Sequence, residues 1–386
     1  MRPRAGNNCL LLQSNSNKLS KRKLPMTIPV SIGKRIALLR PLLILGIVYV
    51  HTGGVGDAIA WKWSNPFEYL LAVFRDGLFR AGVPMLTLIS GYLLFGSNLD
   101  RFPLKLLRKK FRTLAVPFVV FNLGFIAIML PMEVFTGFSH RNVLIGADTQ
   151  NWANYLFAIT GSPYNYPLYF LRDMMVLVLL APLFGWLLRN TPLIGLVAIS
   201  GIFYFDFDSY IVLRSTSAIL FYVGGMAALY RWDLHVLDKY AKLCALLVVL
   251  SCLIAIAMRI QDRSLLSLGL PFLIWPASGL LHDRGGALVL KYSKYSFFIF
   301  VAHAPIMFFS WELVLRYARF IPFPIYYVLA PAVTVAFLVA VYELLNRYVP
   351  ITLDFVLGNR NQQRGPLSGK RIDDAGALAP VEPSPR

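Results

Sequence analysis

Residues 36–55 read IALLRPLLILGIVYVHTGGV, an apolar run that is interrupted by only two groups able to carry charge, Arg40 and His51. About twenty apolar residues are needed for an α-helix to cross the hydrocarbon core of a bilayer. Similar runs recur along the chain, and they are continuous rather than alternating, which favours helices over the strands of a barrel. This stretch therefore predicts the first of several transmembrane helices.

We expect ten such helices, of which the second contains an interrupting proline, Pro84, and the fifth is short. Their approximate positions are residues 36–55, 78–96, 114–134, 167–188, 192–205, 214–230, 242–258, 264–281, 296–311 and 325–346. Of the 386 residues, 57% are hydrophobic and 15% charged, whereas soluble domains are nearer half and a quarter. The predicted fold class is all-α, a polytopic membrane helical bundle, and its gaps are too short for a soluble catalytic domain.

The basic residues, 38 Lys and Arg against 19 Asp and Glu, lie mostly in the gaps between the apolar runs. If the N-terminus is cytoplasmic, the gaps on that side hold about three times as many Lys and Arg as the opposite gaps. We therefore expect both termini to be cytoplasmic. The net charge of +19 then reflects membrane topology, and we expect no nucleic-acid partner.

The chain divides into a basic N-terminal segment (1–33), a transmembrane domain (34–348) and a cytoplasmic tail (349–386). We expect no regular structure in either end, because both are polar and poor in apolar periodicity. Met26 is an alternative start, since the segment that follows it leads directly into the first span.

Arg40 and His51 lie eleven residues apart, which is close to three helical turns, so both face the same side of the first helix. Charged groups inside a span are costly and often functional. One interpretation is an anion anchor at Arg40 below a general base at His51, because imidazole titrates near neutral pH. The alternative is that Arg40 reaches the lipid headgroups and His51 is a structural histidine at the membrane interface.

Four further polar residues lie in predicted spans: Ser90, Tyr92, Arg172 and His303. Each could line a substrate path or stabilise an oxyanion, or instead pack or pair inside the bundle. Between the second and third spans lies a basic loop, Lys105–Arg112. Its residues Arg108, Lys109, Lys110 and Arg112 suit either lipid headgroups or a phosphorylated cytosolic ligand. No pattern typical of a metal site, a P-loop or a serine nucleophile is present.

Five segments together resemble the membrane-bound acyltransferase 3 family of bacterial sugar O-acyltransferases. They are the Arg40–His51 pair in RPLLILGIVYVH, the segment VPMLTLISGYLL (83–94), RKKFRTLAVP (108–117), YFLR (169–172) and SFFIFVAH (296–303). The resemblance covers roughly residues 34–346. The chain departs from the family pattern at Ala37, where many members carry aspartate, and at Tyr169, where tryptophan is usual.

The resemblance implies about ten helices and the transfer of an acyl group to sugar hydroxyls of a secreted or surface polysaccharide. The acyl group would usually be acetyl, from cytosolic acetyl-CoA as co-substrate, with no bound cofactor and no metal. His51 would be the general base, and direct transfer and a covalent acyl-enzyme both stay open. The implied location is the bacterial inner membrane, with a polysaccharide or lipid-linked glycan as acceptor and a polysaccharide synthase complex as a candidate partner.

Two other functions fit a polytopic chain with buried charges. One is a transporter of a glycan or lipid-linked sugar. The other is a non-enzymatic partner of a polysaccharide synthase. A requirement for acyl-CoA separates the acyltransferase from the transporter, and loss of glycan acylation in His51→Ala separates it from the assembly partner.

Overall fold

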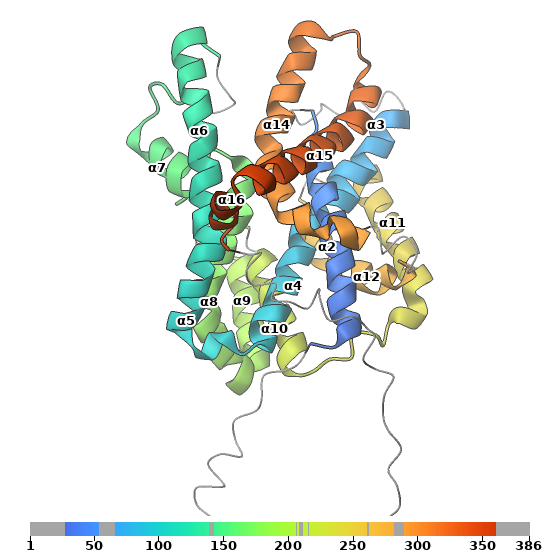
Figure 1. Ribbon diagram of the computed structural model, residues 1–386. Coiled ribbons are helices and arrows are strands. Elements are labelled where there is room, and N and C mark those ends of the chain that lie inside the picture. Colours follow the sequence, from blue (N-terminus) through green and yellow to red (C-terminus); the bar gives the residue numbers. More distant parts are fainter. Residues whose placement is uncertain are drawn as a thin grey trace, which may run out of the picture.

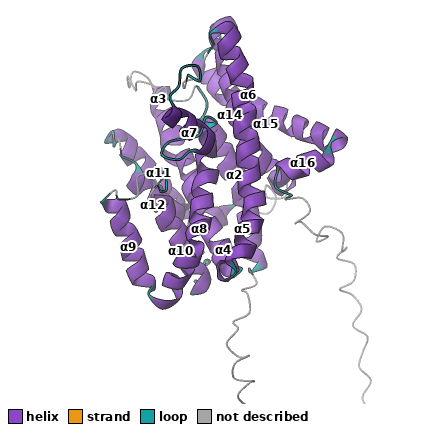
Figure 2. Cartoon of the chain, turned by 90° about the vertical axis from the view of Figure 1, so that its left-hand side faces the viewer, coloured by secondary structure: helices purple, strands orange, loops and turns teal. Residues whose placement is uncertain are grey.

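The computed structural model describes residues 28–53, 66–138, 143–205, 207, 211–214, 216–260, 262–281 and 289–359. All regular structure in these residues is helical, which confirms the all-α prediction (Figure 1, Figure 2). The helices are α2 (Val30–Val50), α3 (Pro66–Leu71), α4 (Gly82–Gly96), α5 (Pro103–Lys110), α6 (Val116–Thr136), α7 (Thr149–Phe157), α8 (Tyr169–Asn190), α9 (Pro192–Tyr204), α10 (Thr216–Leu229), α11 (Ala241–Ala257), α12 (Ser264–Ala277), α14 (Ser296–Tyr317), α15 (Phe323–Tyr348) and α16 (Pro350–Val356).

A helix overlaps each of the ten predicted spans. Six continuous helical segments in the described part of the chain are long and apolar enough to cross a membrane. The segments 192–204, 216–229 and 264–280 are apolar but shorter. The helix α2 is also long, with 21 residues, but it is not one of these six, and it carries three charged residues, Lys34, Arg35 and Arg40. The chain is a multi-pass helical membrane protein, and the count of ten crossings stays a prediction.

The first span, the second span and the basic loop differ from the expectation, and the first ends earlier than predicted, because α2 stops at Val50. Pro84 does not interrupt the second span, because it is the third residue of α4, where a backbone N–H has no partner within that helix. Helical turns at Ala72–Leu78 and Phe79–Ala81 join α3 to α4, so this segment begins at Pro66. The prediction that the basic stretch forms a loop is also wrong, because the stretch is helical. Pro103 stands at the N-terminus of α5, and a π-helical turn, Phe111–Ala115, leads into α6.

The expectation of an unstructured tail over 349–386 is wrong for its first part, because Pro350–Val356 forms α16. Pro350 suits the start of a helix, where its missing N–H costs nothing. The chain after α16 packs on the turn that precedes α6: a Cβ on Gly358 would lie 2.7 Å from Cα of Thr113. Residues 1–27, including Met26, and 360–386 lie outside the described residues.

The helices α4 and α10 approach at backbone distance. A Cβ on Gly91 would lie 2.0 Å from the carbonyl oxygen of Phe221, and one on Gly224 would lie 2.2 Å from that of Leu88. Such distances are open only to glycine, and small residues allow membrane helices to pack this closely. Gly91 therefore serves the close packing of α4 on α10.

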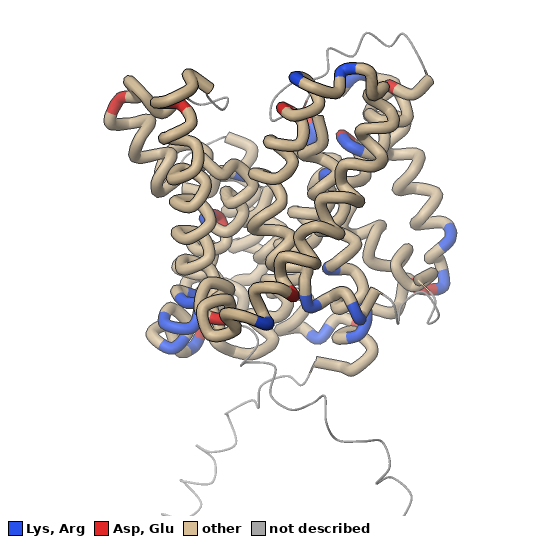
Figure 3. The backbone as a smooth tube through the Cα atoms, turned by 45° about the horizontal axis from the view of Figure 1, so that its top comes forward, with Lys and Arg blue, Asp and Glu red and all other residues tan. Residues whose placement is uncertain are grey.

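The basic residues gather toward one end of the bundle. Figure 1 places α5 and the start of α2 at the lower end, and the far ends of α6 and α14 at the upper end. Lys and Arg are most numerous at the lower end, and a smaller group lies at the upper end (Figure 3). This distribution supports a cytoplasmic lower end.

Candidate active site

His51 directly follows Val50, the last residue of α2. Just beyond it, Gly53 has a φ of 95°, a left-handed conformation that glycine adopts without a Cβ clash. A Cβ on Gly53 would also approach the ring of Phe323 to 3.1 Å. The imidazole of His51 is half-buried, so it borders the interior of the bundle and stays partly accessible.

The structure brings His303 of α14 against His51, from a position 252 residues away in the chain. His303 is fully buried, and the centroids of the two rings lie 5.1 Å apart with planes inclined at 66°. Nε2 of His303 lies 3.4 Å from Nδ1 of His51. Two of the candidate residues found in the sequence thus form one site.

The backbone carbonyls show which nitrogen of each ring carries the proton, because a carbonyl oxygen can only accept a hydrogen bond. Nδ1 of His51 lies 2.8 Å from the oxygen of Ile47 and therefore carries a proton. Nδ1 of His303 lies 2.7 Å from the oxygen of Phe300 and carries one for the same reason. In a neutral ring Nε2 is then an acceptor. Nε2 of His303 faces the N–H of His51, and Nε2 of His51 has no hydrogen-bond partner in the described part of the chain.

Tyr166 also lies near His51, with ring centroids 6.1 Å apart. Its hydroxyl accepts a hydrogen bond of 3.1 Å from Nη2 of Arg214, whose guanidinium lies 5.5 Å from the centre of the Tyr169 ring. The sequence analysis missed Tyr166 and Arg214 as site residues. A faint signal was the recurrence of tyrosine at 166 and 169, one helical turn apart, just before the quoted YFLR motif.

Arg172 and Asp173 hold the segments that surround this cluster. The guanidinium of Arg172 donates to the carbonyl oxygens of Ala158, Ile159 and Ile211 and to the carboxylate of Asp173. Asp173 is buried and accepts the backbone N–H groups of Leu213, at 2.9 Å, and Arg214, at 3.1 Å. These bonds fix the backbone from which Arg214 reaches Tyr166, so we assign Arg172 to positioning rather than to an oxyanion hole.

An ionic cluster lies beside the end of α2. Nε of Arg75 donates to the carbonyl oxygen of Val50, the residue before His51, at 3.3 Å. Asp76 is buried and pairs with Arg80 at 3.0 Å and with Arg263 at 3.4 Å. Two arginines therefore share the Asp76 carboxylate, and Arg75 holds the backbone at the residue before His51.

Ser90 and Tyr92 are engaged elsewhere in the bundle. The hydroxyl of Ser90 donates to the carbonyl oxygen of Leu86 in its own helix, at 2.7 Å. Tyr92 is buried in the core that includes Phe95 and Phe221, where α4 packs on α10. Their contacts favour a packing role over a place in the site.

Arg40 and the basic residues lie away from the histidine pair along the helices. At a rise of about 1.5 Å per residue, Arg40 lies roughly 16 Å below His51 along α2, and its side chain is exposed. Arg108, Lys109 and Arg112 are exposed and Lys110 is half-buried, all near the lower end of the bundle. The described residues contain no group of His, Cys, Asp or Glu that could hold a metal ion.

Known proteins resemble this chain over most of its length. A family model described as an acyltransferase domain matches residues 34–343. The succinoglycan biosynthesis protein ExoH of Rhizobium meliloti (strain 1021) is 31% identical over 351 residues, which cover 86% of this chain and 93% of that protein. No solved structure matches the chain significantly.

Proposed function

This chain belongs to the acyltransferase family whose model covers residues 34–343, and we propose that it moves an acyl group from a cytosolic acyl-CoA to a sugar hydroxyl of a secreted or surface polysaccharide. The similarity to a succinoglycan biosynthesis protein supports a polysaccharide acceptor. We further propose that the acyl group is acetyl, that the membrane is the bacterial inner membrane and that the chain works beside a polysaccharide synthase.

The observation that carries the proposal is the His51–His303 pair. Nε2 of His51 takes the proton of the acceptor hydroxyl while the hydroxyl oxygen attacks the thioester carbon. The new C–O bond forms, the C–S bond breaks, and the thiolate of CoA takes the proton from His51. General-base help of this kind is worth about 10²–10⁴-fold.

His303 assists as a second acceptor for the Nδ1–H that His51 donates to Ile47, because Nε2 of His303 lies 3.4 Å from that nitrogen and the attraction increases when His51 becomes positively charged. The carbonyl oxygen of Ile47 keeps His51 in the required tautomer. Arg214, held at Tyr166 beside His51, is our candidate for the cation that stabilises the oxyanion. The contacts of Ser90, Tyr92 and Arg172 make them weaker candidates.

The donor enters from the basic end of the bundle. We propose that Arg108, Lys109, Lys110 and Arg112 bind the phosphates of CoA and that Arg40 guides the donor toward His51. Exposed basic side chains on a helix can turn toward a phosphorylated ligand, and their hydrogen bonds to phosphate are charge-assisted. The thioester end of the donor then has to span about 16 Å along α2, from Arg40 to His51.

The test uses membranes that carry the full chain, isotope-labelled acetyl-CoA and the polysaccharide of the host. We expect base-labile label on the glycan with the wild type and none with His51→Ala, while both proteins reach the membrane in equal amounts. If acetyl-CoA gives no label, succinyl-CoA is tried next. Full transfer by His51→Ala contradicts the base assignment, and failure of every acyl-CoA favours a transporter or an assembly partner.

A further inference from the structure

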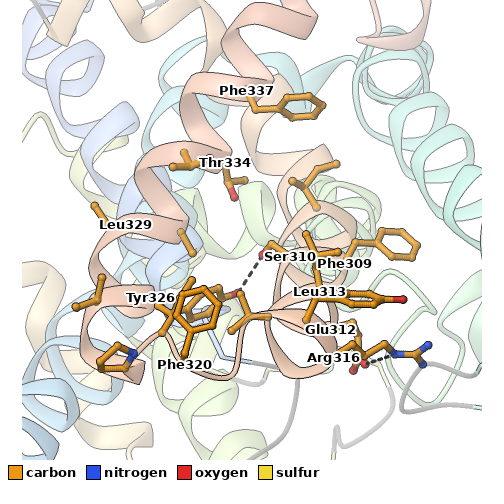
Figure 4. A pocket seen from close by; sticks show the side chains of 18 of the residues that line it. Phe309, Ser310, Glu312, Leu313, Arg316, Phe320, Tyr326, Leu329, Thr334 and Phe337 are labelled. Atoms are coloured by element: carbon orange, nitrogen blue, oxygen red, sulfur yellow. Dashed lines mark hydrogen bonds and ion pairs between the residues drawn. The ribbon is translucent and has the colours of Figure 1, made fainter.

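An apolar groove of about 1020 Å³ lies between α14 and α15. Two pairs of polar side chains in its walls bond to each other. The hydroxyls of Ser310 and Tyr326 lie 3.0 Å apart, and Nε of Arg316 lies 4.0 Å from Glu312 (Figure 4). Such walls suit the hydrocarbon of any bilayer lipid. A cluster of side chains able to react lies elsewhere, at the basic end of the bundle where α2 begins (Figure 1).

Ser31, His235 and Asp238 form a hydrogen-bonded chain at the start of α2. Nδ1 of His235 lies 2.8 Å from a carboxylate oxygen of Asp238, which can only accept, so this nitrogen carries a proton. In the neutral ring Nε2 is then an acceptor, and the hydroxyl of Ser31 lies 3.1 Å from it. A hydroxyl that donates to an imidazole, which is itself held by a carboxylate, is the arrangement that activates serine as a nucleophile.

Neighbouring contacts fix this geometry. Arg35 donates to both carboxylate oxygens of Asp238, at 2.8 and 2.6 Å. A carboxylate offers about four acceptor sites, so one is left for the N–H of His235. The guanidinium of Arg35 lies 5.2 Å from the centre of the Trp275 ring, and the indole N–H of Trp275 donates to the carbonyl oxygen of Leu234 at 2.8 Å. The Arg35–Asp238 pair by itself would fasten the loop to α2, so a purely structural role does not require a hydroxyl on Nε2 of His235.

The three residues are open to water and lie where an oxyanion can be stabilised. The side chain of His235 is 41% exposed, and Ser31 is exposed as well. Ser31 is the second residue of α2, and the N–H groups of a first helical turn have no acceptor within the helix and carry partial positive charge. They are donors for the oxygen of a carbonyl that Ser31 attacks. The exposed Lys34 and Lys239 follow Ser31 and Asp238 by three residues and one residue, and they suit the phosphates of CoA.

This cluster is separate from the histidine pair. Ser31 and His51 lie twenty residues apart in the chain, about 30 Å along the helix. That distance is about the whole thickness of a hydrocarbon core. An acyl group on Ser31 therefore cannot reach Nε2 of His51, and water is the acceptor at the basic end of the bundle.

We propose that Ser31 is the nucleophile of a second active site, which hydrolyses cytosolic acyl thioesters. Nε2 of His235 takes the proton of the Ser31 hydroxyl while the hydroxyl oxygen attacks the thioester carbon. The new C–O bond forms, the C–S bond breaks, and the thiolate takes the proton from His235. Water then attacks the acyl-serine and gives a proton to His235, which returns it to the oxygen of Ser31 as the carboxylic acid leaves. This activity does not depend on acyl transfer to a glycan.

The test treats the full chain in lipid nanodiscs with a fluorophosphonate, whose phosphorus bonds to the oxygen of an activated serine as fluoride leaves. We expect mass spectrometry to find the label on Ser31. Ser31→Ala should lose the label, and His235→Gln should react about 10²–10⁴-fold more slowly, because the base is gone. The matched control is Ser97→Ala, since Ser97 is also exposed but its hydroxyl donates to the carbonyl oxygen of Leu94. This control should be labelled as the wild type is.

Release of CoA from acetyl-CoA, without any glycan, is the second measurement. It is made in the His51→Ala background, so that the histidine pair does not contribute. CoA release should persist in that background and fall to the level of empty nanodiscs when Ser31→Ala or His235→Gln is added. Ser31→Ala alone should still transfer acyl groups to the glycan.

The outcomes separate this proposal from the proposed function. An unlabelled Ser31, or labelling at the wild-type rate in His235→Gln, overturns the second site. A lower melting temperature of His235→Gln together with an unlabelled Ser31 shows that the cluster only fastens the loop to α2. If CoA release depends on Ser31 but no acyl group ever reaches a glycan, the proposed function fails and the second site stands.

Discussion

Replacing His303 by phenylalanine tests the histidine pair most directly. The substitution keeps a ring in a fully buried position and removes the Nε2 acceptor that lies 3.4 Å from Nδ1 of His51. The tautomer of His51 does not change, because the carbonyl oxygen of Ile47 at 2.8 Å still accepts the same proton. The substitution also removes the Nδ1–H that His303 donates to the carbonyl oxygen of Phe300, which affects the fold, whereas the effect on the chemical step is the loss of the help that His303 gives when His51 becomes charged.

The expected magnitude follows from that geometry. A hydrogen bond to a charged group contributes about 1.5–3 kcal/mol. The separation of 3.4 Å is long for two nitrogens, so we use the lower end of that range. A loss of about 1.5 kcal/mol in the transition state lowers kcat about tenfold. The KM for acyl-CoA should not change, because the donor is proposed to bind at the opposite end of α2.

The assay is transfer of labelled acyl groups to glycan by the purified protein in lipid nanodiscs, with kcat and KM measured separately. His303→Gln is the matched control, since its amide oxygen can again accept from His51 and should restore part of kcat. Thermal unfolding of each variant checks that the bundle is intact. A loss as large as that of His51→Ala, or a wild-type kcat in a folded His303→Phe protein, would refute the reasoning.

Three further predictions test the bundle and the two ends of the site. Gly91→Ala should destabilise the protein by about 1–3 kcal/mol, because the added Cβ meets a backbone oxygen 2.0 Å away; in thermal melts Gly124→Ala, with nothing within 4 Å, should stay close to the wild type. Asp173→Ala should cost about 3–5 kcal/mol, since it leaves the buried Arg172 guanidinium without its carboxylate, and Asp173→Asn should cost less in the same melts. The double variant Arg108→Ala, Lys109→Ala should raise the KM for acyl-CoA about tenfold with kcat unchanged; an unchanged KM would show that this helix contacts lipid headgroups instead.

Much of the fold could be predicted because the relevant signals are local. The part of the run 36–55 that meets lipid must be helical, since its own N–H and C=O groups are the only partners there, and α2 covers the run as far as Val50. Helix boundaries were less predictable where polar residues could form either a helix or a loop. The basic stretch at 105–112 looked like a loop from its charge, but Leu, Lys and Arg are good helix formers and Pro103 starts the helix.

The sequence by itself determined the membrane bundle, the basic residues between its apolar runs and His51 as an expensive polar group in an apolar run, because hydropathy and charge act within about twenty residues of chain. Only the tertiary structure decided which polar groups meet. His303 faces His51, and Arg214 reaches Tyr166, through the rotation and crossing of helices far apart in sequence. That geometry is set by the packing of many side chains at once, including the glycine contact of α4 with α10, and no local pattern encodes it.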